Sequence, residues 1–179
     1  MILLLLAVAF IPMGFEARLA ARHERALRAA GAVEPGDDVY WVMRVAYPAC
    51  FAAMAAEGWL RGVTMDAMFA VGAPVFIFSK LLKYWAIATL GPRWTFRVLV
   101  PPDSSRLVLG PYRVLRHPNY VAVVGELVGA GLMAHATVSG VVSVVGFGAL
   151  MVARIRAEEA CLAEAANRRS REGGRTRAK

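Results

Sequence analysis

Residues 110–120 hold the densest group of potentially reactive side chains in the chain, in the order GPYRVLRHPNY. Two arginines, one histidine and two tyrosines fall within this stretch, which lies between long apolar runs. A residue before proline is pushed out of the helical region, and proline suits the first helical position. We therefore expect His117 to cap a helix that begins at Pro118. Free N–H groups at such a helix start favour a carboxylate or another anion, and a capping histidine with a solvated ring is the alternative.

A second polar cluster follows the last long apolar run and contains Arg154, Arg156, Glu158 and Glu159. Spacings of four and three residues place each arginine on a helix face with one glutamate. Taken alone, this pattern is typical of a helix end with weak surface ion pairs. A helical hairpin over residues 120–154 would return the cluster to the neighbourhood of His117. The two clusters together would then line a cofactor pocket.

Glu126 lies among valines and glycines, eight residues after Pro118. An acid in such apolar surroundings is costly unless it is paired or faces a hydrated cavity. Its expected partner is Arg154, Arg156 or Lys83. We interpret Glu126 as part of a functional pocket, and a purely structural ion pair is the alternative.

The composition indicates that membrane-spanning helices position these residues. Hydrophobic residues make up 58% of the 179 residues and charged residues 19%, against about 45–50% and about 25% in a soluble domain. Residues 1–19, 39–60 and 67–90 predict three spans. Residues 120–154 predict a hairpin of two short helices with a turn at residues 135–140. The expected fold is an all-α integral membrane protein with about five transmembrane helices, a C-terminal helical hairpin and a cytosolic cofactor pocket.

Lys80 and Lys83 lie three residues apart in the third expected span and face the same side. Intramembrane lysines often mark a functional site. Because this helix is expected to end near residue 90, we favour the alternative that both side chains extend to the membrane interface.

The distribution of positive charge supports five spans and a topology. Basic residues concentrate in the first connection, in the third connection and in the C-terminal tail, whereas the other two connections contain only Arg61. The positive-inside rule then places the N-terminus outside and the C-terminus in the cytosol. It also explains the net charge of +8 without nucleic acid. Cys50 and Cys161 lie in no metal-binding spacing, so no metal site is expected.

Three regions follow from this pattern. Residues 1–66 would form a two-span region with a basic interfacial loop, and residues 67–165 the core that carries the two polar clusters. Residues 166–179 are basic and rich in glycine, and we expect a disordered tail.

The combination of motifs resembles the isoprenylcysteine carboxyl methyltransferase family. It comprises GPYR at residues 110–113, RHPNY at residues 116–120, a helical hairpin, and then Arg154, Glu158-Glu159 and Leu162. The resemblance covers about residues 83–162. It implies an integral membrane enzyme whose C-terminal half wraps S-adenosylmethionine (SAM) at the cytosolic face. The composition, rich in Ala, Arg, Gly and Val, suggests a bacterial source and therefore a bacterial inner membrane. A lateral opening would admit a lipophilic small molecule from the bilayer.

The same resemblance suggests roles for individual residues. Arg154 or Arg156 would help place the acceptor, and Glu126 joins them as a catalytic candidate. The expected cofactor-binding residues are Tyr112, Arg116, His117, Pro118, Asn119, Tyr120, Glu158 and Glu159. Members that act on prenylated proteins continue with a Phe-Gly and tyrosine-rich segment, whereas AEAANRRSREGG follows Leu162 here. The chain therefore looks more like the bacterial branch that O-methylates long-chain alkylpyrones or alkylresorcinols.

The acceptor determines what the residues must do. Methyl transfer from a sulfonium requires positioning and exclusion of water. A carboxylate acceptor is already ionised, whereas a phenol with a pKa near 10 benefits from a base or a nearby cation. His117, Glu126 and the two arginines are the candidates for that role.

Three other functions remain open on the sequence. Sterol-type membrane reductases that use NADPH also carry an RHPNY motif, although they place Gly-Glu closer to it than Gly125-Glu126 lies here. A phospholipid N-methyltransferase would share the paired glutamates. A non-enzymatic membrane scaffold is disfavoured by the cost of burying Glu126.

Overall fold

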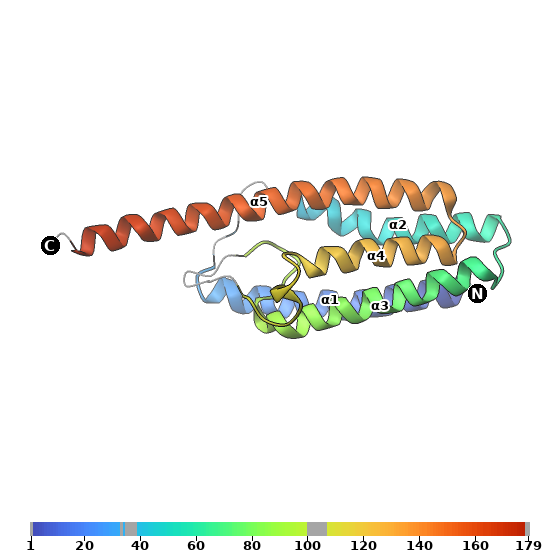
Figure 1. Cartoon of the computed structure of the whole chain (residues 1–179), viewed down its shortest axis with the longest axis horizontal. Helices are drawn as coiled ribbons and strands as arrows, with labels where there is room; N and C mark the ends of the chain where they lie inside the picture. Colours follow the sequence, from blue (N-terminus) through green and yellow to red (C-terminus); the bar gives the residue numbers. More distant parts are fainter. Residues whose placement is uncertain (1, 33, 35–38, 100–106, 178–179) are drawn as a thin grey trace.

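The computed structural model describes residues 2–32, 34, 39–99 and 107–177, with side chains described as far as residue 160. Five α-helices form an elongated bundle (Figure 1). They are α1 (Ile2–Ala29), α2 (Tyr40–Leu60), α3 (Ala67–Leu90), α4 (Pro118–Met133) and α5 (Thr137–Arg177). Two short 3-10 helices, η1 (Gly91–Arg93) and η2 (Gly110–Arg113), lie between α3 and α4. The described part of the chain contains no strand, so the predicted all-α fold is confirmed.

Three of the helices are long and apolar enough to cross a membrane, namely α1, α3 with η1, and residues 137–160 of α5. This indicates an integral membrane protein. The number of such helices among the described residues is three, whereas the sequence predicts five spans. The reason lies in the other two helices. Helix α2 carries Arg44 and Glu57 within its 21 residues, and α4 has only 16 residues.

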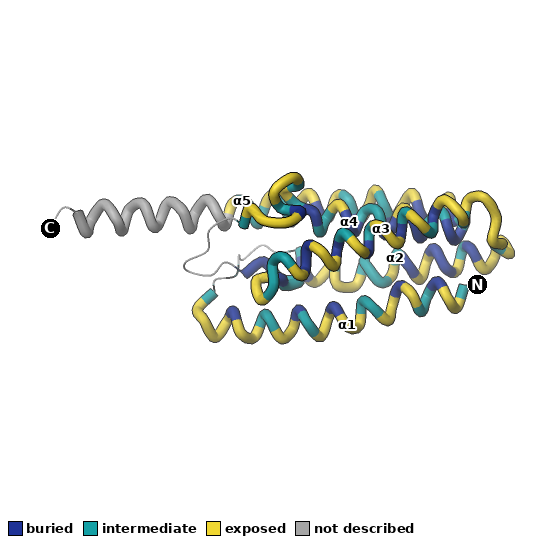
Figure 2. Tube along the Cα trace, turned by 60° about the horizontal axis from the view of Figure 1, so that its bottom comes forward, coloured by how far each residue is buried: buried dark blue, intermediate teal, exposed yellow. Residues whose placement is uncertain are grey.

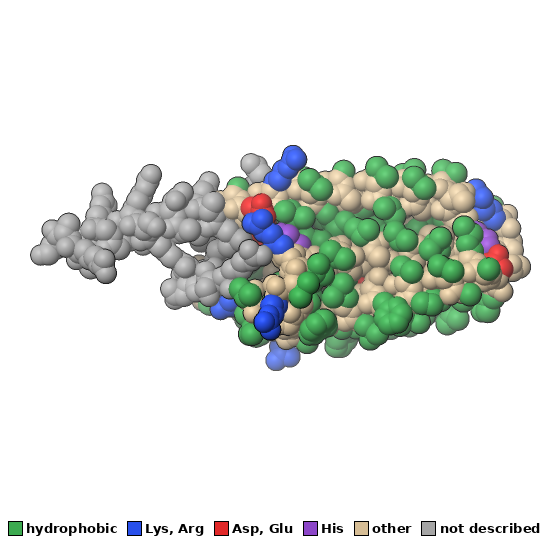
Figure 3. Space-filling model, in the orientation of Figure 1, with side chains coloured by type: hydrophobic (Ala, Val, Ile, Leu, Met, Phe, Trp, Pro, Cys, Tyr) green, Lys and Arg blue, Asp and Glu red, His purple; other side chains and the backbone are tan. Residues whose placement is uncertain are grey.

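Apolar side chains cover the outer surface of the bundle. Large apolar residues such as Leu3 and Ile11 are 81% and 73% exposed. Figure 2 shows exposed positions along the outer sides of the helices and buried positions between them, and Figure 3 shows the charged side chains concentrated toward the two ends. The core between the helices contains Phe51, Met54 and Leu127, each at most 1% exposed. Such an apolar exterior is expected of a protein whose solvent is lipid.

The predicted C-terminal hairpin is present, because α4 ends at Met133 and α5 begins at Thr137. Its second arm is not short. Helix α5 continues to Arg177, through the region where the sequence predicts a disordered tail. The Ala- and Glu-rich composition of residues 157–166 accounts for part of this continuation, since both residue types favour helices.

The glycines of α4 allow it to approach α3 more closely than α5. A Cβ atom at Gly129 would lie 2.6 Å from the backbone nitrogen of Phe76, and one at Gly125 would lie 2.1 Å from the Ser79 hydroxyl oxygen. Between the two arms of the hairpin, only Gly131 and Gly140 approach each other among the described glycines. These glycines therefore pack α4 mainly on α3, which holds Glu126 beside the lysines of α3.

Candidate functional site

The two predicted polar clusters meet at Tyr120. Its hydroxyl donates to Glu158 Oε2 at 3.2 Å and accepts from Arg154 Nε at 3.0 Å. The His117 ring stacks on the Tyr120 ring, with centroids 5.4 Å apart. Residues that lie 34 to 38 positions apart in the chain are thereby brought together at the end of the bundle where α4 begins. The hairpin produces the convergence that the sequence predicted.

His117 occupies the N-cap position of α4, and Pro118 is the first helical residue, as predicted. The histidine makes no side-chain capping bond. Its Nε2 atom lies 3.7 Å from Glu159 Oε1, and Arg116 forms an ion pair of 3.0 Å with the same oxygen. Glu159 therefore joins the RHPNY segment to α5 on the outer side, while Glu158 joins it on the side of Tyr120.

Arg154 is buried, and its Nη2 atom also donates to the carbonyl oxygen of Phe96. Arg156 is exposed and does not line the cavity described next. Of the two arginines proposed to place the acceptor, the structure therefore brings Arg154 to the cavity. Tyr112 lies in η2, where burial and the nearby Glu158 carboxylate raise the pKa of its phenol.

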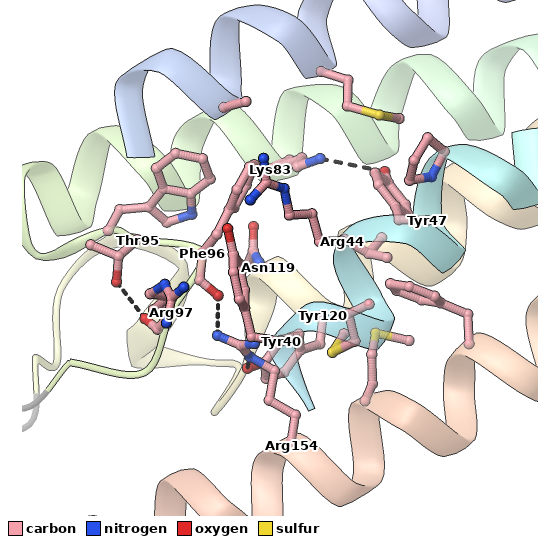
Figure 4. Close-up of a pocket in the computed structure, with 18 of the residues that line it drawn as sticks. Tyr40, Arg44, Tyr47, Lys83, Thr95, Phe96, Arg97, Asn119, Tyr120 and Arg154 are labelled. Atoms are coloured by element: carbon pink, nitrogen blue, oxygen red, sulfur yellow. Dashed lines mark hydrogen bonds between the residues drawn. The ribbon is translucent and has the colours of Figure 1, made fainter. Parts of the chain in front are cut away.

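A cavity of about 590 Å³ adjoins the Tyr120 junction. This volume falls in the range of about 300–1,000 Å³ that small-molecule sites occupy. Its polar lining includes Arg44, Asn119 and Arg154, and its apolar lining comes from α1, α2, α4 and α5 (Figure 4). The apolar residues include Phe10, Met13, Met43, Val123, Phe147 and Met151. The same cavity therefore presents both charged groups and an apolar surface to a ligand.

Two of the buried side-chain atoms that make no hydrogen bond within the described structure belong to the start of α4. They are Oδ1 of Asn119, a residue of the cavity wall, and Nε2 of His117, which does not line the cavity. Leaving a buried polar atom without a hydrogen bond costs about 1–3 kcal/mol. Asn119 Oδ1, on the cavity wall, is therefore available to accept a hydrogen bond from a ligand.

Arg97 borders the cavity on the segment between η1 and η2. Its guanidinium stacks 4.4 Å from the ring centroid of Tyr40 and pairs with Glu34 at 2.5 Å. Burial raises the pKa of Glu34, but the hydrogen bonds from Arg97 and Arg28 outweigh it and hold the pKa below its ordinary value. This pair ties the chain after α1 to the wall of the cavity.

A group of buried charged residues lies beside the cavity and contributes Lys83 to its lining. Lys83 Nζ lies 2.6 Å from Glu16 Oε2 and 3.4 Å from Glu126 Oε1, and Lys80 Nζ lies 3.3 Å and 3.0 Å from the same two side chains. The hydroxyl of Tyr47 donates to Glu126 and accepts from Lys83 Nζ at 3.4 Å. We call Glu16, Tyr47, Lys80, Lys83 and Glu126 the ionic cluster. All four charged residues are less than 9% exposed.

The ionic cluster corrects one expectation and supports another. Lys80 and Lys83 do not extend to the interface, because carboxylates from α1 and α4 hold them inside the bundle. Lys83 is a partner of Glu126, as anticipated, whereas Arg154 bonds to Tyr120 instead. Sequence reasoning missed Glu16 and Tyr47. The available signal was an acid inside an apolar helix, but the first span was expected to end at residue 19, which placed Glu16 near the membrane interface.

Comparison of the sequence with known protein families identifies the family of this chain. Residues 70–164 match the isoprenylcysteine carboxyl methyltransferase family, which is more than half of the chain. The chain belongs to this family. Family membership implies a membrane methyltransferase that uses SAM. The match includes the RHPNY segment, Glu126 and the paired glutamates, whereas Glu16 and Tyr47 lie before it.

Two bacterial relatives extend the similarity over most of the chain. The uncharacterized protein YpbQ of Bacillus subtilis is 29% identical over 161 residues, which cover 90% of this chain and 96% of YpbQ. An uncharacterized protein of Haemophilus influenzae is 25% identical over 145 residues, covering 80% of this chain and 84% of that protein. No solved structure matches the chain.

Proposed function

We propose that this protein O-methylates an acidic hydroxyl of a long-chain amphiphile, such as an alkylresorcinol or an alkylpyrone, with SAM as the methyl donor. The observation that carries the proposal is the cavity itself. Its wall joins Asn119, Tyr120 and Arg154, from the family's motif segments, to apolar side chains of α1, α2 and α5. A donor and an alkyl chain would therefore meet in one space.

The residues at the Tyr120 junction suit the chemistry of SAM. This molecule carries a sulfonium, an ammonium, hydroxyls, an adenine amine and a carboxylate. Glu158 and Glu159 offer negative charge, Asn119 Oδ1 offers an acceptor, and Arg116 and Arg154 offer positive charge. His117 Nε2 and Asn119 Oδ1 are two of the four buried side-chain atoms that lack a hydrogen bond in the described structure. When bound, SAM supplies an electrophilic methyl group on its sulfonium sulfur.

The protein's own contribution is positioning and the exclusion of water. Tyr120 fixes Arg154 on one side and Glu158 on the other, so the charged groups are oriented before a ligand arrives. Apolar residues such as Phe10, Phe147 and Met151 would surround an alkyl chain and keep the polar end of the cavity dry.

A methyl-transfer assay tests the proposal. Protein in detergent would receive SAM labelled in its methyl group, together with an alkylresorcinol, an alkylpyrone, a farnesylcysteine derivative or phosphatidylethanolamine. We expect label in the first two acceptors, at a rate that Arg154→Gln lowers by about tenfold or more. Arg61→Gln, at the opposite end of the bundle, is the matched control and should not change the rate. Label only in farnesylcysteine or in the phospholipid would contradict the proposed acceptor.

A further inference from the structure

The ionic cluster presents only part of itself to the cavity. Tyr47 and Lys83 are among the residues that line it, whereas Glu16, Lys80 and Glu126 are not. Figure 4 shows Lys83 and Tyr47 directed toward one another at the cavity wall. A ligand in the cavity therefore meets one ammonium and one phenol hydroxyl, with two carboxylates directly behind them.

Hydrogen bonding gives the Tyr47 hydroxyl a direction. Its proton points to Glu126 Oε2, and one of its two lone pairs accepts from Lys83 Nζ. The remaining lone pair is available to accept a proton from a ligand. The cluster thus combines an acceptor at the cavity, a carboxylate that can receive a proton, and a cation beside the place where negative charge would form.

From this arrangement we propose that the ionic cluster binds the acceptor's phenolic or enolic hydroxyl and removes its proton. The acceptor O–H donates to Tyr47 Oη, and the proton of Tyr47 passes to Glu126 Oε2. Tyr47 is then again a phenol, Glu126 is a neutral acid, and the acceptor oxygen is an anion beside Lys83. This assignment rests on the proposed function for the identity of the acceptor.

Charge balance favours a hydroxyl over a carboxylate at this place. With all four side chains ionised, two lysines and two glutamates have no net charge. After the proton moves, the two ammonium groups face Glu16 and the acceptor oxyanion, so the balance is kept. A carboxylate ligand would arrive without a proton and add uncompensated negative charge, which is expensive in a buried site.

A purely structural role does not explain the position of Tyr47 and Lys83 at the cavity. Well-packed apolar residues often hold helices together at least as well as buried ion pairs. The cluster does connect α1, α2, α3 and α4, but that function does not require a lysine and a hydroxyl on the cavity wall. Binding a ligand group that becomes an anion does require a cation and a hydrogen-bonding hydroxyl at this place.

The test measures the ionisation of a bound probe and requires no turnover. The probe is 2-dodecyl-4-nitrophenol, whose phenolate absorbs visible light. Its apparent pKa would be determined by absorbance titration with the purified protein and in empty detergent micelles. Because an opposite charge nearby favours the ionised form, we expect the pKa of the bound probe to fall by about one unit or more. Tyr47→Phe should reduce this shift.

A charge-balanced variant removes Lys83 without stranding a carboxylate. Lys83→Met combined with Glu16→Gln leaves Lys80 paired with Glu126, and it should abolish the shift. Arg61→Gln is the control and should retain it. If the variants do not fold, the proposal can still be tested with the wild-type protein alone, by comparing its affinity for the probe with its affinity for a matched ligand. The methyl ether of the probe has no proton to give and should bind at least about tenfold more weakly than the phenol.

The outcomes separate this inference from the proposed function. An unshifted probe pKa, a shift that survives the double variant, or equal affinity for phenol and ether would overturn the role of the ionic cluster. SAM binding and labelling of alkylresorcinol could still occur in that case. Failure of the wild-type protein to bind SAM would instead contradict the methyltransferase proposal, whatever the probe does.

Discussion

Arg154 Nε and the hydroxyl oxygen of Tyr120 lie 3.0 Å apart, although 34 residues separate them in the chain. The contact exists because α4 and α5 form a hairpin whose open end carries both residues. The same hydroxyl donates to Glu158, so one oxygen connects an arginine of the cavity wall to a glutamate of the family motif. Two charged side chains of the proposed cofactor site, Arg154 and Glu158, therefore share this hydroxyl as a hydrogen-bond partner.

Tyr120→Phe tests that dependence. The substitution keeps the ring that stacks on His117 but removes both hydrogen bonds of the hydroxyl. A lost hydrogen bond to a charged group costs about 1.5–3 kcal/mol, so SAM affinity should fall by about tenfold to a hundredfold. Calorimetric titration with SAM measures the change. Unchanged affinity in a folded variant would show that the hydroxyl does not organise the site.

Gly14→Leu tests whether the cavity is the acceptor site. Gly14 lines the cavity, and an added Cβ atom at this position meets no atom within 4 Å, so a leucine should extend into the open space. We expect alkylresorcinol affinity to fall by at least about tenfold while the fold is retained. Gly146→Leu is the matched control, since Gly146 is also helical and unobstructed but lies outside the cavity lining. Equal affinity in the two variants would place the acceptor elsewhere.

The stability of the ionic cluster should be strongly non-additive. Glu16→Gln alone leaves Lys80 and Lys83 facing a single carboxylate, which should lower the free energy of unfolding by about 3–5 kcal/mol. Adding Lys83→Met restores neutrality, so the double variant should recover part of that loss. Reversible unfolding in mixed micelles provides the comparison. If the loss in the double variant equals the sum of the losses in the two single variants, the side chains of the cluster do not act as a unit.

We expect an acid-sensitive contact at Asp66, which lies at the end of the bundle opposite the Tyr120 junction. It caps α3, and its hydrogen bond with the Phe69 amide lowers its pKa, with His135 acting in the same direction against the effect of burial. A lowered pKa contributes stability above the unfolded value near 3.9, and this contribution is lost as the pH falls through the folded value.

Asp66→Asn keeps a capping side chain but removes the charge. Melting temperatures of the two proteins should therefore differ at pH values above the unfolded pKa, and the difference should shrink only as the pH falls through the lowered folded-state pKa of Asp66. A difference that stays constant down to strongly acid pH would argue against a stabilising contribution from the ionised Asp66 carboxylate.

The parts of the site that follow local rules could be predicted from the sequence. Proline after His117 marks the start of α4, and an apolar stretch interrupted near His135 marks a hairpin. Together these two signals bring Tyr120 and Arg154 to the same end of the bundle. The roles of the site residues in binding and catalysis stay predictions until they are measured.

The ionic cluster depends on long-range packing and could not be predicted in the same way. Glu16 follows a long apolar run and lies near the end of the expected first span, where an interfacial position is the simple interpretation, yet its side chain is buried. Tyr47 is one aromatic residue among many in α2, and nothing local indicates that its hydroxyl meets Glu126. The lysines of α3 could reach an interface by length alone. Only the close packing of α3 on α4, with α1 beside them, makes the buried pairing available.

Calorimetric titration of the purified protein with SAM, and separately with NADPH, tests the central claim most directly. The account predicts that SAM binds, that NADPH does not, and that both His117→Ala and Glu158→Ala weaken SAM binding. NADPH binding without SAM binding would contradict the account and favour a membrane reductase.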